Sequence, residues 1–396
     1  SINGANNLTI NTQMLSNSNT ISGNALTALN IDELDNRGLI YGGNLNVGSD
    51  GQYVVESATA GVRNFSSGVK QGLVAANELN YYSSGSLNNI YQAKVLNLDV
   101  ASGHGLAVSG DMLASQQVNI NADSAAFNNT AQIFIGESTQ VSRWDIAGEL
   151  TNNGSIKSAS ELQIAANNVT NNGGVLADGL RFDLATLANS AGASIQSSGY
   201  LSVSGADRAL VDDNAVSVVN SGTLASSGYF QLASATLSNN KDAELISAAD
   251  MTLTAPALLN NGSIHATGDM TLTTSNLTNQ ADGLIVTAQG DIDIRGGSGF
   301  ATNAGQILSA GDLSLAAYSL TNSGNVEAAG DANFNVARFD NQASGFVNVD
   351  GVLTFEGTVC LYWCYGVGFS NSGEIYGGTV NARQYSSFTN DGVVVA

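Results

Sequence analysis

Short runs of alternating apolar and polar residues recur along the C-terminal two thirds of the chain. In one such stretch, Ile264, Ala266, Met270, Leu272 and Leu277 occupy alternate positions. A period of two residues is typical of strands that bury one face. Asn-Gly and Ser-Gly pairs separate the runs and predict turns. These stretches have no helical periodicity, so the pattern predicts an all-β chain.

The alternating runs return with a period of about 20 residues, which is typical of a solenoid whose coils pack on one another. A Gly-Asp or Ala-Asp pair anchors each repeat of the regular part. The anchors are Ala249-Asp250, Gly268-Asp269, Gly290-Asp291, Gly311-Asp312 and Gly330-Asp331. Three short strands joined by turns in each coil predict a right-handed parallel β-helix. The single proline, Pro256, agrees with this fold, because backbone N–H groups are needed for hydrogen bonds between coils.

The repeat changes character near residue 150. Residues 150–396 read as regular coils, whereas residues 1–149 contain only scattered echoes, such as the segment 105–111. Aromatic and polar stretches, among them Tyr81-Tyr82, lie between these echoes. We interpret residues 1–149 as an irregular, decorated part of the same β-helix and a candidate binding region. An independent small domain is the alternative.

Composition narrows the choice of partners. Charged residues make up 11% of the chain, against about 25% in typical proteins. We therefore expect Asn, Ser, Thr and Gly to cover the surface, where stacked neutral side chains can form hydrogen-bonded ladders. The net charge of −21 leaves no basic patch, so nucleic acid is an implausible partner. No apolar run reaches the roughly 18 residues of a membrane helix. The chain starts at Ser1 and stops within the pattern, and we expect a monomeric fragment.

Two stretches, residues 259–272 and 320–331, show the repeat most fully. They resemble the repeats of filamentous haemagglutinin and of contact-dependent growth inhibition exoproteins. The resemblance covers residues 150–396 well and residues 1–149 poorly. It implies a segment of a secreted virulence filament at the bacterial cell surface, exported through an outer-membrane two-partner transporter. It also implies adhesion, or binding to a target-cell receptor that is a protein or a glycan.

A carbohydrate-active β-helix enzyme and a purely structural spacer are the alternatives to a receptor-binding segment. Such an enzyme needs clustered carboxylates, often with a basic residue that holds an acidic sugar. Asp212-Asp213 is interpreted as a solvated acidic turn. Asp291 and Asp293 are expected on one outward face, with Arg295 as a surface ion-pair partner. We therefore expect no enzymatic activity and no cofactor.

Metal binding is not expected either. His104 and His265 are too few and too far apart in the sequence for a zinc site, and His265 is expected on an outward face. The aspartates of the repeat anchors would stack into a row of like charges one coil apart. We expect this row to be structural, with each carboxylate accepting N–H bonds from the residues that follow it in its turn.

An insertion near residues 358–368 interrupts the repeat with Cys360-Leu361-Tyr362-Trp363-Cys364. Three intervening residues permit a disulfide between Cys360 and Cys364, which suits an oxidising, secreted setting. The candidate binding residues are Tyr362, Trp363 and Tyr365. These aromatic side chains either pack on the coils or form a rigid binding tip. A cysteine hook, as in some two-partner secreted adhesins, is disfavoured because the repeat resumes after the insertion.

Overall fold

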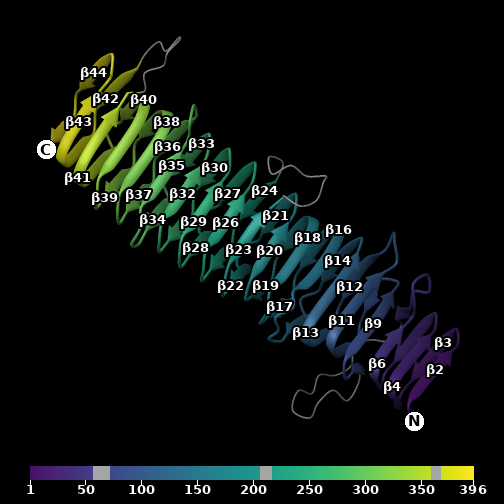
Figure 1. The fold of residues 1–396 in the computed structure, drawn as a ribbon. Coiled ribbons are helices and arrows are strands. Elements are labelled where there is room, and N and C mark those ends of the chain that lie inside the picture. The colour runs from purple at the N-terminus through teal and green to yellow at the C-terminus, as the bar shows by residue number, and fades with distance from the viewer. Residues whose placement is uncertain (57–71, 206–215, 358–366) are drawn as a thin grey trace. The chain divides into compact units, whose positions relative to one another are not determined.

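The computed structural model describes residues 1–56, 72–205, 216–357 and 367–396 (Figure 1). This part of the chain contains strands and no helix, which confirms the predicted all-β class. None of its segments is therefore a helix that could span a membrane. The chain divides into two compact units. Unit 1 comprises Ser1–Thr186 and Ala193–Ser198, and unit 2 comprises Leu187–Gly192 and Gly199–Ala396.

The strands of unit 1 are β1 (Ile2–Gly4), β2 (Asn7–Asn11), β3 (Met14–Asn17), β4 (Thr20–Asn30), β5 (Glu33–Asn36), β6 (Leu39–Val47), β7 (Val55–Glu56), β8 (Gly72–Ala75), β9 (Glu78–Ser83), β10 (Ser86–Leu87), β11 (Ile90–Val100), β12 (Gly105–Val108), β13 (Asp111–Ala122), β14 (Ser124–Phe127), β15 (Gln132–Ile135), β16 (Ser142–Asn152), β17 (Ser155–Ser158), β18 (Leu162–Asn171), β19 (Gly174–Ala177), β20 (Leu180–Asp183) and β22 (Ser194–Ser197).

The strands of unit 2, which takes in all but the first residue of β21, are β21 (Thr186–Asn189), β23 (Leu201–Ser204), β24 (Ser217–Asn220), β25 (Thr223–Ser226), β26 (Phe230–Ala233), β27 (Thr236–Asn239), β28 (Glu244–Ser247), β29 (Met251–Thr254), β30 (Ala257–Asn260), β31 (Ser263–Ala266), β32 (Met270–Thr273), β33 (Asn276–Asn279), β34 (Leu284–Thr287), β35 (Ile292–Arg295), β36 (Phe300–Asn303), β37 (Gln306–Ser309), β38 (Leu313–Asn322), β39 (Asn325–Ala328), β40 (Ala332–Asn341), β41 (Phe346–Glu356), β42 (Gly368–Asn371), β43 (Glu374–Arg383), β44 (Ser387–Asn390) and β45 (Val393–Val395).

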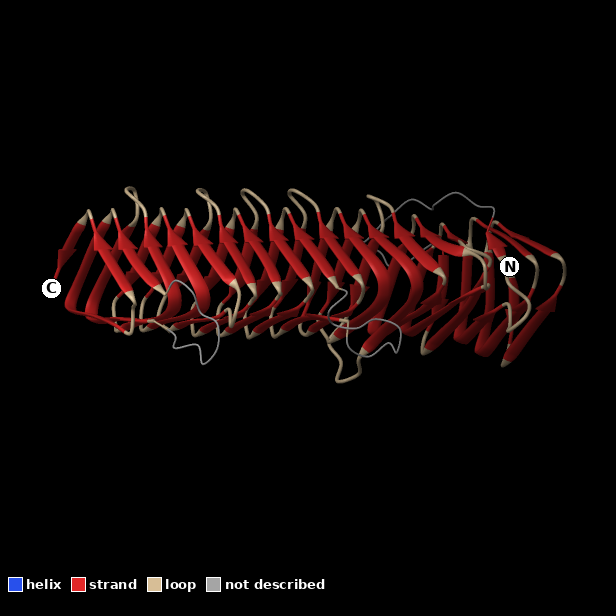
Figure 2. Cartoon of the chain, turned by 90° about the horizontal axis from the view of Figure 1, so that it is seen from above, coloured by secondary structure: helices blue, strands red, loops and turns tan. Residues whose placement is uncertain are grey.

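Unit 2 shows the repeating coil most simply. One coil consists of β30, β31 and β32, which pair in parallel with β33, β34 and β35 of the next coil. Figure 2 shows the strands as red arrows joined by short tan turns. Turn length sets the coil length, so the step from Asn260 to its partner Asn279 is shorter than the step from Met270 to its partner Ile292. The predicted parallel β-helix is therefore confirmed, with coils of about 20 residues as in other solenoids. Its right-handed sense stays a prediction.

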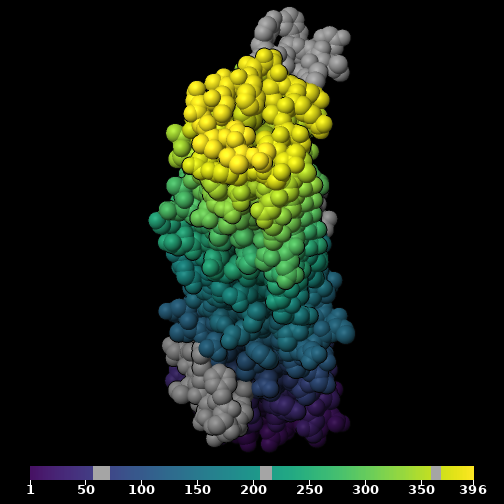
Figure 3. Space-filling model, turned by 90° about the vertical axis from the view of Figure 1, so that its left-hand side faces the viewer, coloured from purple at the N-terminus to yellow at the C-terminus, as the bar shows by residue number. Residues whose placement is uncertain are grey.

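Alternate residues of each strand form the core. Ile264, Ala266, Met270, Leu272 and Leu277 are each at most 2% exposed, as the alternation predicted. Each large buried aliphatic side chain stabilises the fold by about 1.5–3 kcal/mol. Burial depends on having a coil on both sides. In Figure 3 the C-terminal residues of the chain, which include β43 to β45, are yellow.

Phe388 of β44 illustrates this dependence on neighbouring coils. Its ring stacks on Phe369 of β42, with centroids 4.4 Å apart. Phe369 is 3% exposed, yet Phe388 is 56% exposed. The two residues have the same position in consecutive coils. A single coil contact therefore leaves the outer face of an inward side chain open to solvent.

Unit 1 is built from the same parallel pairing, and several of its strands are longer than β30 to β35. In β11, β13, β16 and β18 one strand runs through the corner of the coil, and a register shift marks the corner, as between Ile146 and Glu149. The core of unit 1 also holds a tryptophan among its aromatic side chains. Trp144 is 1% exposed, packs against Phe127 with ring centroids 5.3 Å apart, and donates its indole N–H to the Val118 carbonyl at 3.1 Å.

Candidate functional site

The predicted Cys loop lies outside the described residues. This applies to the disulfide proposed between Cys360 and Cys364 and to the candidate binding side chains Tyr362, Trp363 and Tyr365. The acidic pair Asp212-Asp213 is likewise outside the described part of the chain.

The strands on both sides of the Cys loop are well anchored. Glu356, at the end of β41, pairs with Asn335, and Gly368, at the start of β42, pairs with Arg338. Both partners belong to β40, so the chain leaves and re-enters the coil stack beside the same strand. Core phenylalanines with ring centroids 4.5 to 5.3 Å apart pack here: Phe334, Phe339, Phe355 and Phe369. Glu356 and Gly368 are thereby both held beside β40.

The aspartates of the repeat anchors form an exposed ladder along unit 2. The Oδ1 atom of each one accepts a hydrogen bond from a backbone N–H one coil further on, at 2.7 to 3.0 Å. The acceptors are Asp250, Asp269, Asp291, Asp312 and Asp331, and the last donor is Val352. The predicted structural role is confirmed, but the donor was expected within the same turn. The nearest N–H lies in the next coil because equivalent turns stack in register.

This ladder also explains why glycine precedes most of these aspartates. A Cβ atom on Gly311 would lie 2.1 Å from the Asp291 Oδ1 atom, and one on Gly330 would lie 2.1 Å from that of Asp312. Ala249 is the exception at the first rung. Phe230 pairs with Met251, so the position before Phe230, equivalent to Asp250, is occupied by Tyr229 rather than by an aspartate. Alanine therefore meets no carboxylate there.

Replacing Gly311 with alanine is expected to lower the free energy of unfolding by about 1–3 kcal/mol, because the new methyl group overlaps a fixed carboxylate. Urea unfolding followed by circular dichroism measures the change. Gly174→Ala is the control, since a Cβ atom there meets only Ser194 Oγ at 3.8 Å. Adding Asp291→Ala to Gly311→Ala should recover part of the loss. Equal losses for Gly311→Ala and Gly174→Ala would contradict the steric explanation.

A second ladder, made of asparagines, runs inside unit 2. Each Nδ2 group donates to the Oδ1 atom of the asparagine one coil further on, at 2.7 to 3.0 Å. These side chains are at most 1% exposed, and they are Asn189, Asn220, Asn239, Asn260, Asn279, Asn303, Asn322, Asn341 and Asn371. The second Nδ2 hydrogen reaches a backbone carbonyl, for example Asn279 to Gln306 at 3.0 Å. The ladder thus satisfies backbone groups at a corner that water does not reach.

The expectation that asparagine would mainly cover the surface is wrong for this ladder. In β33 the asparagine points to the same inward side as a core leucine, because Leu277 and Asn279 are two positions apart and both buried. This spacing of two residues was visible in the sequence, but the turn predicted next to the asparagine favoured an exposed side chain. Burial is tolerated because every polar group of the amide has a partner in the neighbouring coils.

Among the described residues, the other aspartates and histidines that were considered as catalytic or metal-binding residues do not form a common site. Asp293 forms the predicted surface ion pair with Arg295, with the Arg295 Nη2 atom 2.6 Å from the Asp293 Oδ2 atom. Asp291 does not join them, because its carboxylate belongs to the ladder. His104 is exposed before β12, and His265 lies on the outward side of β31, as expected. No group of three or more His, Cys, Asp or Glu side chains among the described residues is arranged to hold a metal ion.

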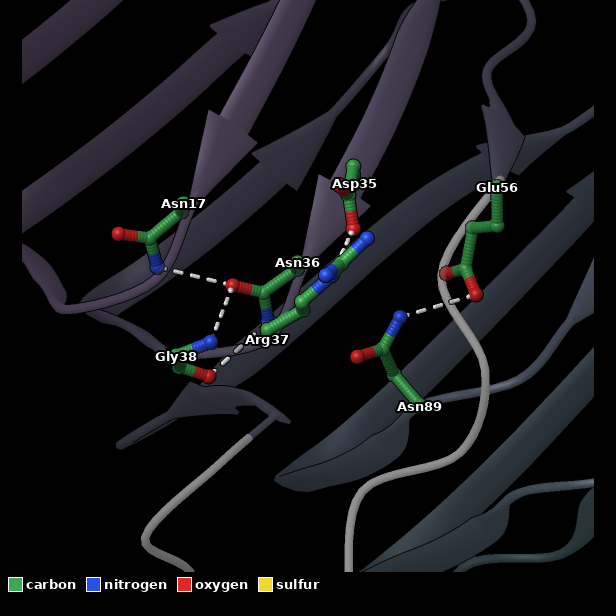
Figure 4. Close-up of polar contacts among 7 residues, drawn as sticks. All are labelled: Asn17, Asp35, Asn36, Arg37, Gly38, Glu56 and Asn89. Carbon is green, nitrogen blue, oxygen red and sulfur yellow. Dashed lines mark hydrogen bonds and ion pairs between the residues drawn. The ribbon is translucent and has the colours of Figure 1, made fainter.

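Unit 1 contains a buried carboxylate that the sequence analysis missed. Glu56 is 6% exposed and accepts hydrogen bonds from the Tyr81 and Tyr91 hydroxyls, from the Asn88 N–H at 2.8 Å and from Asn89 Nδ2 at 3.0 Å. Figure 4 shows the contact between Glu56 and Asn89. Burial raises the pKa of Glu56, although these hydrogen bonds act in the opposite direction. The only sequence signal was that Glu56 lies two positions after Val54, so that both side chains point to the same, inward side of the strand.

Figure 4 also shows that unit 1 has its own interior amide contacts. Asn17 Nδ2 donates to Asn36 Oδ1 at 2.8 Å, and Asn36 Nδ2 donates to the Gly38 carbonyl at 3.2 Å. Beside them, Arg37 and Asp35 form an exposed ion pair at 3.0 Å. Asn17 and Asn36 therefore hold a corner of unit 1 in the same way as the asparagine ladder holds unit 2.

A shallow groove of about 260 Å³ lies on the outward face of β9, β11 and β13 in unit 1. Tyr82, Asp99 and Asn121 are in register across the three strands and form one row of its lining. Asn121 Nδ2 donates to one Asp99 oxygen at 3.1 Å. The Tyr82 ring makes an edge-to-face contact with Tyr53, with centroids 6.2 Å apart. The row therefore combines a carboxylate, an amide and an aromatic ring.

The second row of the groove is a surface ladder of amides. Asn119 Nδ2 donates to Asn97 Oδ1 at 2.9 Å, Asn97 Nδ2 donates to Asn80 Oδ1 at 2.8 Å, and Asn80 Nδ2 donates to Asn46 Oδ1 at 3.0 Å. Asn97 Nδ2 also lies 2.7 Å from the Glu78 carboxylate. These contacts fix the orientation of every amide in the row. This region was a candidate binding region from its sequence, but these residues were not among the predicted binding residues.

The coils, their parallel pairing and their interior asparagine contacts define both units as repeat proteins of the parallel β-helix class. The family model of the haemagglutinin repeat matches residues 95–143, 145–206, 185–255, 245–296 and 296–354. These segments cover more than half of the chain, which therefore belongs to the haemagglutinin repeat family. The match begins at residue 95, within the part where the sequence alone showed scattered echoes. Neither the curated proteins nor the solved structures that were compared include a match.

Proposed function

We propose that this chain is a receptor-binding segment of a secreted filamentous exoprotein at the bacterial cell surface. The observation that carries the proposal is the series of haemagglutinin repeats across residues 95–354. The parent protein would be an adhesin or a contact-dependent inhibition filament, exported through a two-partner transporter of the outer membrane. In this proposal the parallel β-helix is the scaffold, and the departures from its regular coils bind the target cell.

The distribution of side chains supports this division of labour. Both ladders of unit 2 use their polar groups on neighbouring coils, so they offer little that is specific to a partner. Aromatic side chains often anchor interfaces. The two departures from the repeat contribute such side chains: Tyr53, Tyr82 and Phe134 within residues 50–149, and Tyr362, Trp363 and Tyr365 in the Cys loop near 358–368. A Cys360–Cys364 disulfide would hold Tyr362 and Trp363 in place and lower the entropy lost on binding.

An enzymatic role has less support. Haemagglutinin repeat proteins are generally adhesins or structural filaments. In the described part of unit 2, the ladder aspartates accept backbone N–H bonds and Asp293 pairs with Arg295, so these carboxylates already have structural partners. We propose that the chain is not a carbohydrate-active enzyme. A glycan-release assay on target-cell surface polysaccharide tests this, because release of sugar by the purified chain would contradict it.

Binding of the purified chain to intact target cells tests the proposed function. Trp363→Ala and the pair Cys360→Ala/Cys364→Ala are expected to weaken binding at least about tenfold if the Cys loop contributes, the equivalent of losing one anchor side chain. Tyr318→Ala is the matched control, since Tyr318 packs against exposed Phe300 on the regular coils. Absence of binding by the wild-type chain would favour a purely structural spacer. Unchanged binding by both loop variants would place the site elsewhere.

A further inference from the structure

We propose that the groove on β9, β11 and β13 of unit 1 binds one ring of a neutral saccharide. The inference rests on the proposed function, because it names the class of receptor and the place where the receptor binds. The groove measures about 260 Å³, below the roughly 300–1,000 Å³ of sites that enclose drug-sized ligands. A groove of this size suits a small ligand such as a single sugar ring of a longer glycan.

The row formed by Tyr82, Asp99 and Asn121 has the hydrogen-bonding groups that adjacent sugar hydroxyls require. A sugar hydroxyl both donates and accepts, as a serine hydroxyl does. Asp99 accepts from Asn121 through one oxygen, and among the described residues nothing donates to its other oxygen. The side-chain oxygen of Asn121, Oδ1, is a second acceptor on the next coil. Two neighbouring hydroxyls could thus donate to two acceptors that are one coil apart.

Tyr82 supplies the apolar surface that the C–H face of a sugar ring needs. The Tyr82 side chain is held by Tyr53 and by the turn that begins at Gly48. A Cβ atom on Gly48 would lie 3.1 Å from the Tyr82 Cβ atom and 2.6 Å from the Gln52 carbonyl oxygen. Gly48 also has a φ angle of +74°, which favours glycine. The turn therefore reaches Tyr82 only because residue 48 has no side chain.

The second row makes the groove rigid before a ligand arrives. Asn80, Asn97 and Asn119 are held by one another, so little side-chain entropy is lost when a sugar binds against them. This rigidity distinguishes the groove from an ordinary polar surface, where long side chains must be ordered on binding. A fixed amide row also presents its remaining groups in one defined direction, which favours a ligand with a defined pattern of hydroxyls.

The residues that line the groove carry a net negative charge, which favours a neutral ligand over an anionic one. The residues that line it include Asp99 and no lysine or arginine. Partial burial and, next, the Asp99 carboxylate raise the pKa of Tyr53 beside the groove. A sialic acid or a phosphate would be repelled here. A calcium ion, which takes about six to eight oxygen ligands, would find too few, since Asp99 is the only carboxylate in the lining.

Ligand-observed NMR with the purified chain tests the inference. The probes are the methyl glycosides of glucose, galactose, mannose and N-acetylglucosamine, with the methyl glycoside of N-acetylneuraminic acid as the anionic comparison. We expect at least one neutral glycoside to bind and the anionic one not to bind. Tyr82→Ala, and Asp99→Asn, which turns an acceptor into a donor, should each weaken binding at least about tenfold.

The matched controls are Tyr318→Ala and Asp293→Asn, which change a tyrosine and an outward aspartate on the regular coils of unit 2. Both should bind the glycoside like the wild type. Circular dichroism and the unfolding midpoint confirm that each variant is folded. The inference is overturned if no neutral glycoside binds, if the anionic sugar binds better, or if folded Tyr82→Ala and Asp99→Asn bind normally.

The cell-binding assay separates this inference from the proposed function. If the chain binds cells and Tyr82→Ala binds them equally well, the groove is not the receptor site and the proposed function stands. If the chain binds the glycoside through Tyr82 and Asp99 but does not bind cells, the groove is a sugar site and the proposed function fails.

Discussion

Replacing Asn279 with alanine is expected to lower the free energy of unfolding by about 2–6 kcal/mol, because several buried polar groups lose a partner, at roughly 1–3 kcal/mol for each group left unsatisfied. Asn260 Nδ2 loses the Asn279 Oδ1 acceptor at 2.8 Å, and Asn303 Oδ1 loses its donor at 2.8 Å. The Gln306 carbonyl loses a further bond of 3.0 Å. Water cannot replace these contacts, because Asn279 is completely buried.

Asn276→Ala is the matched control, since it removes the same amide from an exposed position on the same strand. Chemical denaturation of both variants, followed by circular dichroism, measures the difference. The control should lie within about 0.5 kcal/mol of the wild type, as is usual for exposed positions. If the two variants lose equal stability, the buried ladder does not stabilise unit 2 and its role is limited to guiding the register of the coils.

Replacing Glu56 with alanine is expected to lower the free energy of unfolding of unit 1 by about 3 kcal/mol or more, since several buried donors lose their shared acceptor together. The donors are the Tyr81 and Tyr91 hydroxyls, the Asn88 N–H and Asn89 Nδ2. Glu137→Ala, at an exposed position of unit 1, is the control and should change little. Chemical denaturation followed by circular dichroism measures the loss for both variants. A loss no larger than that of Glu137→Ala would contradict the prediction.

The pH dependence of the same site has a defined sign. Burial raises the pKa of Glu56 above its ordinary value of 4.5, so the native state holds more protons than the unfolded state between these two values. Stability therefore falls as pH rises through that interval. The stability of the wild type relative to Glu56→Gln, which does not titrate, should be greatest at low pH and should decrease as pH rises above 4.5. A difference that grows with pH would mean that the hydrogen bonds outweigh burial.

The local features of the fold could be predicted from the sequence because they depend on neighbouring residues. The alternation around Ile264 and Leu272 indicated the inward positions, and the spacing of the Gly-Asp anchors indicated coils of about 20 residues. A structural role for the anchor aspartates was predicted from their preference for turns, but the N–H groups that they accept lie in the next coil. The family resemblance was also local, since it rested on short stretches such as 259–272.

The contacts between coils could not be predicted, because they depend on coil lengths that vary along the chain. Asp99 pairs with Tyr82 of the preceding coil and with Asn121 of the following coil. More residues separate Asp99 from Asn121 than from Tyr82, so the second coil is longer than the first. The sequence did not indicate these unequal coil lengths. Without the register between coils, it could not show that the groove residues lie next to one another. Glu56 is separated from Tyr91 by 35 residues, and their hydrogen bond crosses an irregular part of unit 1.

By itself, the sequence determined that the protein is a stack of short strands with alternate residues inward and a turn at each corner. Those properties follow from a two-residue period and from turn chemistry, which act within a few residues. Only the tertiary structure decided which polar side chains meet: Asn260 on Asn279 inside unit 2, and Tyr82 beside Asp99 on the surface of unit 1. Such pairs form one coil apart, and the register that joins them is the result of packing whole coils against each other.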